Sequence, residues 1–259
     1  RLQSASMSTE RAQKARTARP GFFRAALDSF FLPSLCLACS ARPVERVLQG
    51  GVCRSCWDAI PKPAAARCFR CDEPLPAAGA DVCGRCLLDP PAFRTLRGAA
   101  PYRGSARGIL IAFKFRGADF LARHLAQAIA AGVELDGPYG EVVPVPARPL
   151  SRLRRDHAAE TLAAELAARI GSPLCAGRLK KVRATLRQSG LPLDRRRANV
   201  RRAFEAFGRP ARRVLLVDDV ATSASTAREC ASALVQAGAR DVDVVCFARA
   251  TRDDEIAAA

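Results

Sequence analysis

Two adjacent aspartates end a hydrophobic run in the last fifth of the chain. The stretch VLLVDDVATSAST, residues 214–226, leads through Val and Leu to Asp218 and Asp219. Like charges after a buried strand are unfavourable unless a ligand uses them, and two carboxylates can hold the vicinal hydroxyls of a sugar. Hydroxyls that can donate to a phosphate follow at Thr222, Ser223, Ser225 and Thr226. The stretch therefore predicts a ribose 5-phosphate site.

Eight of the eleven cysteines form four CxxC pairs, a spacing that lets two sulfurs face one metal ion. The pairs are Cys36 and Cys39, Cys53 and Cys56, Cys68 and Cys71, and Cys83 and Cys86. A disulfide framework is the competing interpretation. We favour two structural zinc sites, because no apolar secretory segment opens the sequence and the CxxC spacing recurs four times. Sequential pairing, with the first four cysteines in one site, closes the shortest loops.

The other cysteines and the two histidines carry weaker signals. Cys175, Cys230 and Cys246 lie in apolar surroundings without ligand spacing, so we expect core residues. His157 opens a predicted helix and could act as an acid or base, although a solvated or capping role is commoner. His124 lies within an amphipathic helix, where we expect a surface position.

Alternating helical and strand patterns from about residue 93 onward predict the scaffold for the two aspartates. Strands are expected near 97–102, 141–146, 212–219 and 241–250, and helices near 106–117, 119–132, 150–171 and 222–239. This alternation predicts an α/β fold, a parallel sheet flanked by helices. Ligands bind such sheets at the carboxyl ends of the strands, and the amides that open the next helix favour a phosphate. We expect a basic disordered segment over 1–20, a double zinc ribbon with a leading helix over 21–90, and the sheet domain over 91–259.

The net charge of +17 points to an anionic partner. Between residues 176 and 213, thirteen basic residues face two acidic ones, a local excess of eleven. A solvated basic loop is the ordinary interpretation, and phosphate or nucleic-acid binding is the functional one. No run of about 18 uncharged apolar residues predicts a membrane span, and we expect a cytoplasmic protein.

Taken in order, these motifs resemble those of the ComF family of competence-associated proteins, which join a double zinc ribbon to a type I phosphoribosyltransferase domain. The resemblance spans about residues 30–250 and includes LDSFFLPSLCLAC, CGRCLLDPP, FKFRG, VVPVP and RQSGLPLDRRRANVRRAF. It implies that Asp218 and Asp219 bind the ribose of phosphoribosyl pyrophosphate (PRPP), that residues 222–226 bind its 5-phosphate, and that magnesium accompanies the ligand. It also implies a pyrophosphate-side or closing segment with Lys114, Arg148, Gln188, Leu191, Arg196, Asn199 and Phe204.

The sequence departs from the family pattern in two places. Ala224 replaces the glycine of the phosphate loop, where a positive φ or a close phosphate approach is needed. Arg155, Asp156, His157 and Ala158 replace the Gly-Phe-Asn-Gln that follows VPVP in the family. Both changes fall in the expected ligand site and bear on whether catalysis is retained.

Three functions fit the sequence. The first is a binding protein whose zinc ribbons and basic segment hold single-stranded DNA during uptake in natural transformation. In this case the phosphoribosyltransferase domain is kept as a phosphate or nucleotide module. The second is an active phosphoribosyltransferase, although the sequence shows no recognisable pocket for an acceptor. The third is a PRPP-sensing regulator, for which we find no separate DNA-reading helix. We favour the first as the biological role and keep transferase chemistry as the alternative.

Overall fold

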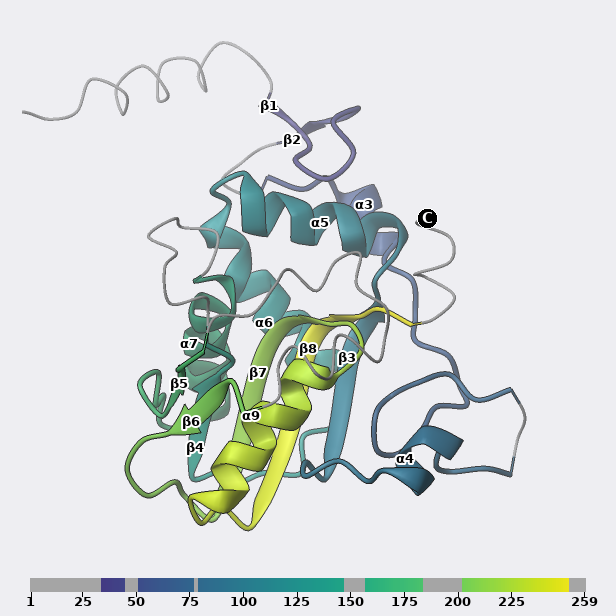
Figure 1. Cartoon of the computed structure of the whole chain (residues 1–259). Helices are drawn as coiled ribbons and strands as arrows, with labels where there is room; N and C mark the ends of the chain where they lie inside the picture. Colours follow the sequence, from purple (N-terminus) through teal and green to yellow (C-terminus); the bar gives the residue numbers. More distant parts are fainter. Residues whose placement is uncertain (1–33, 45–50, 77–78, 147–156, 184–201, 252–259) are drawn as a thin grey trace, which may run out of the picture.

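The computed structural model describes residues 34–44, 51–76, 79–146, 157–183 and 202–251 (Figure 1). Several sequence predictions fall outside these ranges. They are the segment 1–20, the leading helix of the zinc ribbon domain, and the side chains of Arg148, Arg155, Asp156, Gln188, Leu191, Arg196 and Asn199. For these residues the predictions above stand unchanged.

A four-stranded parallel sheet forms the centre of the molecule. In spatial order its strands are β3 (Thr95–Pro101), β8 (Asp241–Arg249), β7 (Arg213–Ala221) and β4 (Glu141–Pro144). The strand β7 pairs with β8 along its whole length and with β4 over its first half. Because all strands are parallel, Asp218 and Asp219, near the end of β7, lie toward the carboxyl edge of the sheet. The predicted α/β sheet is confirmed.

Helices cover both faces of the sheet, which explains why the central strands are almost wholly apolar (Figure 1). One face carries α5 (Gly104–Phe115), the short η1 (Asp119–Leu121), α6 (Ala122–Gly132) and α7 (Ala158–Ile170). The other face carries α9 (Ser225–Gln236). Side chains alternate along β7. Leu215 and Val217 therefore pack in the core under α5, α6 and α7, while Val214 and Leu216 pack in the core under α9. The predicted stop at Gly171 is confirmed by its left-handed conformation at the end of α7.

The two cysteine-rich units pack against different cores. The first contains β1 (Ser34–Leu35), β2 (Pro43–Val44) and α3 (Arg54–Asp58), and it buries Cys36, Val44 and Val52 in the core that α5 and α6 share. The second contains α4 (Gly84–Leu88) and buries Cys68, Cys71 and Cys86 in the α9 core. Figure 1 shows the first unit beside α5 and the second beside the lower part of the sheet.

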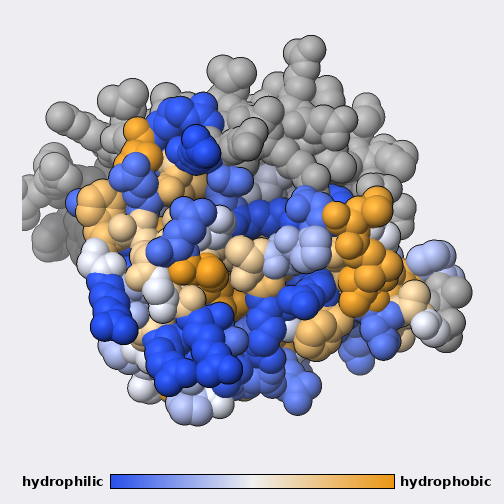
Figure 2. Space-filling view, turned by 60° about the horizontal axis from the view of Figure 1, so that its bottom comes forward, coloured by the Kyte–Doolittle hydropathy of each residue, from blue (hydrophilic) through white to orange (hydrophobic). Residues whose placement is uncertain are grey.

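An antiparallel pair, β5 (Leu179–Lys181) with β6 (Phe204–Ala206), lies beside α9. Exposed apolar side chains occur on the second cysteine-rich unit, with Leu87 and Leu88 of α4 and Phe69 before Cys71. Figure 2 shows apolar side chains gathered on the right of a face where hydrophilic and apolar regions alternate. None of the helices in the described ranges combines the length and apolarity that crossing a bilayer requires.

Candidate functional site

The eight CxxC cysteines gather into two clusters of four thiols. Cys36, Cys39, Cys53 and Cys56 form one, and Cys68, Cys71, Cys83 and Cys86 form the other. Within each cluster all sulfur atoms lie within 4.8 Å of one another. This grouping is the sequential pairing that the sequence predicted. It brings together pairs that have 13 and 11 residues between them in the chain.

The sulfur geometry fits a tetrahedral zinc ion. Zinc–thiolate bonds of about 2.3 Å place neighbouring sulfurs of a tetrahedron about 3.8 Å apart. The Sγ atoms of Cys36 and Cys56 are 3.8 Å apart, and those of Cys71 and Cys83 are 3.6 Å apart. In addition, the N–H groups of Cys53 and Cys83 donate to Cys36 Sγ and Cys68 Sγ, each at 3.3 Å. Donors of this kind stabilise thiolates, the form in which sulfur binds zinc. When bound, zinc would cross-link each unit.

At the carboxyl end of β7 the two aspartates lie in different environments. Asp219 is buried, and its Oδ1 is 2.8 Å from Nζ of Lys114 in the last turn of α5. Asp218 is half-buried and accepts a hydrogen bond from the Asp219 N–H at 2.9 Å. Burial and the neighbouring charge of Asp219 raise the pKa of Asp218 to about 8. The sequence did not predict the ion pair, because Lys114 and Asp219 are far apart in the chain and come together only when it folds.

A tight bend connects the aspartates to α9. Ala224, the N-cap of α9, has φ 58° and ψ 9°, so the left-handed conformation expected where the family has glycine is present with a methyl side chain. No side chain caps the helix. The first amides of α9 therefore lack a capping side-chain acceptor and form a site suited to an anion.

The hydroxyl residues around the bend divide into two groups. Thr222 and Thr226 are half-buried, whereas Ser223 and Ser225 are buried and their Oγ atoms lie 2.9 Å apart. In this arrangement the two serines bond each other across the bend. The hydroxyl groups of the two serines are consequently engaged with each other.

Other predicted residues lie as follows. His157 is exposed, with Nδ1 3.2 Å from Glu160 Oε2 on the same helix, which agrees with the solvated interpretation. The expectation for His124 is corrected: it is half-buried against Trp57 of the first cysteine-rich unit, with ring centroids 5.7 Å apart. Cys230 and Cys246 are fully buried core residues as expected, while Cys175 is only half-buried.

One residue near the bend was not predicted. Arg249 ends β8 and is buried, and its guanidinium donates to the carbonyl oxygens of Ala221, Thr222 and Ala250. In the sequence, Arg249 is only an arginine at the end of an apolar strand. Its role near the bend becomes visible only once β8 is known to lie beside β7.

Comparison with known proteins identifies one domain family and several relatives that span most of the chain. A family model described as a double zinc ribbon domain matches residues 26–87. The DNA utilization protein YhgH of Salmonella typhimurium is 30% identical over 231 residues, which cover 84% of this chain and 98% of the relative. Competence protein F of Haemophilus influenzae is 29% identical over 227 residues, covering 83% and 96%.

The chain belongs to the ComF family. Membership follows from the identity with YhgH over nearly the whole length of that relative, and the zinc ribbon match accounts for the cysteine clusters. A crystal structure of TT1426 from Thermus thermophilus also aligns with 52% of this chain and 84% of its own, at 20% identity. Its TM-score of 0.29 is too low to add to the description of the ComF fold.

Proposed function

We propose that the carboxyl end of β7 and the first turn of α9 bind the ribose 5-phosphate part of PRPP or a related ligand. The observation that carries this proposal is the left-handed Ala224, the N-cap of α9, which has no capping side chain and lies five residues after Asp219. The amides that follow Ala224 would hold the phosphate, with Thr222 and Thr226 as further donors. Asp218 and Asp219 would accept hydrogen bonds from the ribose hydroxyls.

Through their ion pair, Lys114 would hold the Asp219 side chain in place until the ligand arrives. The family resemblance assigns Arg148, Gln188, Arg196 and Asn199 to the pyrophosphate side and the closing segment. Within the described ranges, only the two cysteine clusters bring together three or more metal-ligating side chains. Magnesium would therefore enter with the diphosphate of the ligand, which is its usual mode of binding to such groups.

The biological role that we propose is the handling of single-stranded DNA during uptake, in the cytoplasm and together with uptake machinery. Relatives are named for competence and for DNA utilization. The antiparallel pair of β5 and β6 supports a polyanion partner, because Lys180 of β5 lies 4.5 Å from the ring centroid of Phe207, which follows β6 and is 42% exposed. A lysine beside an exposed aromatic ring can meet both the phosphate and the base of a single strand.

Calorimetric titration with PRPP and magnesium tests the ligand. We expect saturable binding to the wild type and a loss of affinity of at least about tenfold in Asp219→Asn, since each lost charge-assisted hydrogen bond is worth about 1.5–3 kcal/mol. Glu165→Gln on α7 is the matched control and should bind normally. Wild-type protein that releases no heat and shows no competition at millimolar PRPP contradicts the proposal.

Release of pyrophosphate separates the binding function from the transferase alternative. The same protein is incubated with PRPP, magnesium and candidate acceptors, and pyrophosphate is measured. Saturation without release supports a binding module. Release that depends on an acceptor establishes the transferase and replaces the binding-only role.

Fluorescence anisotropy with a labelled single-stranded oligonucleotide tests the DNA role. Affinity should fall steeply between 50 and 200 mM salt, on the order of tenfold or more, because bound phosphates release counterions. Lys180→Gln should weaken binding, whereas the control Lys62→Gln, between the two cysteine-rich units, should change it little. Binding that is absent at low salt, or independent of salt, contradicts the role.

A further inference from the structure

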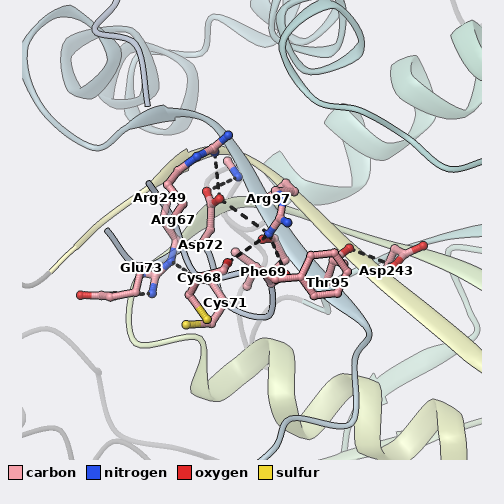
Figure 3. Close-up of polar contacts among 12 residues, drawn as sticks. Arg67, Cys68, Phe69, Cys71, Asp72, Glu73, Thr95, Arg97, Asp243 and Arg249 are labelled. Carbon is pink, nitrogen blue, oxygen red and sulfur yellow. Dashed lines mark hydrogen bonds and ion pairs between the residues drawn. The ribbon is translucent and has the colours of Figure 1, made fainter. Parts of the chain in front are cut away.

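A single buried side chain connects the second cysteine cluster to the bend before α9. Nε of Arg249 donates to the carbonyl oxygen of Cys71 at 3.1 Å, and Nη2 lies 3.0 Å from Glu73 Oε2. Nη1 donates to the carbonyls of Ala221, at 3.1 Å, and Thr222. Figure 3 shows Arg249 above Cys71 and Glu73. One guanidinium thus reaches a zinc ligand's main chain on one side and the bend on the other.

The segment after Cys71 is itself fixed to the sheet. Asp72 is buried, and it accepts a hydrogen bond from the Gly98 N–H of β3 at 2.9 Å and from Arg67 Nη1 at 2.8 Å. Gly98 also leaves room for Arg249, because a Cβ atom at position 98 would lie 2.8 Å from Arg249 Cβ. Arg249 therefore has a defined place between the cluster and the bend.

A second arginine makes a parallel connection. Arg228, in the first turn of α9, donates to the carbonyl oxygen of Asp89 at 2.9 Å and approaches Cys86 Sγ at 3.7 Å. The first cluster contacts different elements: Arg116, after α5, donates to the carbonyl oxygen of Leu37 at 2.9 Å. Within the described ranges, the side-chain contacts of Arg249 link the bend, and those of Arg228 link the first turn of α9, to the second cysteine-rich unit and not to the first.

We infer that Arg249 is a positioning residue through which the zinc-filled second cluster holds the Ala221–Ala224 bend in its anion-binding form. The expected effect on ligand affinity rests on the proposed function, whereas the expected effect on the bend itself does not. A guanidinium has five N–H donors in a rigid fork, so it can hold several carbonyls at fixed positions only while all of its acceptors are fixed. Without zinc, the Cys71 turn would keep its bonds to the sheet through Asp72 but lose its cross-link, so the Cys71 carbonyl and Glu73 would become less rigid acceptors for Arg249. The bend would then lose part of its anchor.

Hydrogen exchange of the intact protein without ligand tests this connection. Cys83→Ser and Cys53→Ser are a matched pair, because each cysteine is the N-cap of a short helix and donates its N–H to a thiol of its own cluster. Each variant is first shown to lose one zinc equivalent. We expect the amides of residues 221–227 to exchange about tenfold faster in Cys83→Ser, the effect of losing about one buried hydrogen bond, and to change little in Cys53→Ser. Exchange in α6 is the internal reference.

Arginine variants then separate positioning from general stability. Arg249→Lys keeps the charge but not the fork, and it should accelerate exchange at 221–227 selectively. Arg94→Lys is the control, because Arg94 pairs with Asp243 near the opposite end of β8. If Arg249→Lys does not fold, Glu73→Gln tests the same anchor from the cluster side.

The outcomes are distinct. Selective acceleration in Cys83→Ser and in Arg249→Lys or Glu73→Gln supports the inference, with PRPP affinity falling in parallel. Unchanged exchange at 221–227 in Cys83→Ser, or equal acceleration in Cys53→Ser, overturns it. If the wild type does not bind PRPP, the proposed function fails, but the exchange rates still decide whether the second cluster holds the bend.

Discussion

The ammonium group of Lys114 lies 2.8 Å from a carboxylate oxygen of Asp219, joining the last turn of α5 to the carboxyl end of β7. The contact is largely buried, with side-chain exposures of 23% for Lys114 and 8% for Asp219. Burial alone would lower the pKa of Lys114, but the charges of Asp219 and Asp218 outweigh it and raise that pKa. The lysine therefore stays charged and holds Asp219 at the edge where a ligand would meet it.

Removing one member of this pair leaves a buried charge without its partner. Lys114→Met is expected to lower the free energy of unfolding by about 3 kcal/mol, measured by urea denaturation. Adding Asp219→Asn to this variant should restore part of the loss, because the unpaired carboxylate is then absent. Additive losses in the double variant would contradict a direct interaction between the two residues.

Asp218 predicts a pH dependence of stability. Its folded-state pKa is raised to about 8, whereas an unfolded aspartate titrates near 4, so the folded protein binds more protons between these values. The contribution of Asp218 to stability is therefore lost as pH rises from about 4 to about 8. Asp218→Asn removes this loss, and the variant should become progressively more stable than the wild type across that window, by roughly 2 kcal/mol or more at pH 8. A constant difference between the two proteins from pH 4 to pH 8 would contradict the raised pKa.

Ala224 carries backbone strain that glycine would relieve. A non-glycine residue in the left-handed region costs about 1–3 kcal/mol, while burial of the Ala224 methyl group returns about 0.8 kcal/mol. Ala224→Gly should therefore raise the free energy of unfolding by roughly 0.2–2 kcal/mol and improve phosphate access. Ala237→Gly, at the other end of α9 where φ is −83°, is the control and should destabilise. A loss of stability in Ala224→Gly equal to that of the control would argue against strain at the bend.

Zinc removal should unfold the two cysteine-rich units, since thiolate coordination supplies much of the folding free energy of such small units. We expect about two zinc ions per chain, and rapid proteolysis within residues 34–88 after chelation. Cys175→Ser is the control, because this cysteine lies outside both clusters and should leave the zinc content unchanged. A protease-resistant 34–88 region in verified zinc-free protein would show that the apolar contacts suffice.

The sequence predicted the parts of this fold that local pattern determines. Apolar runs predicted β7 and β8, the CxxC spacing predicted both clusters, and comparison with the family predicted the left-handed position at Ala224. The Lys114–Asp219 pair and the contacts of Arg249 with Cys71 could not be predicted, because 105 and 178 residues separate their members in the chain. Such contacts depend on strand order, and the sequence pattern does not determine which strand lies beside which.

His124 illustrates the same limit on a smaller scale. Its helix pattern was interpreted without the first cysteine-rich unit, so the residue was expected at the surface. In the structure Trp57 of that unit packs on its ring. A helix face that is amphipathic by itself can still be covered by a neighbouring unit.

A crystal structure of the protein soaked with PRPP and magnesium tests the central proposal most directly. We expect density for the 5-phosphate at the amides of residues 224–227 and for the ribose hydroxyls within hydrogen-bond distance of Asp218 and Asp219. Full-occupancy ligand at another place on the protein, or an empty bend at a PRPP concentration that saturates binding in solution, would contradict it.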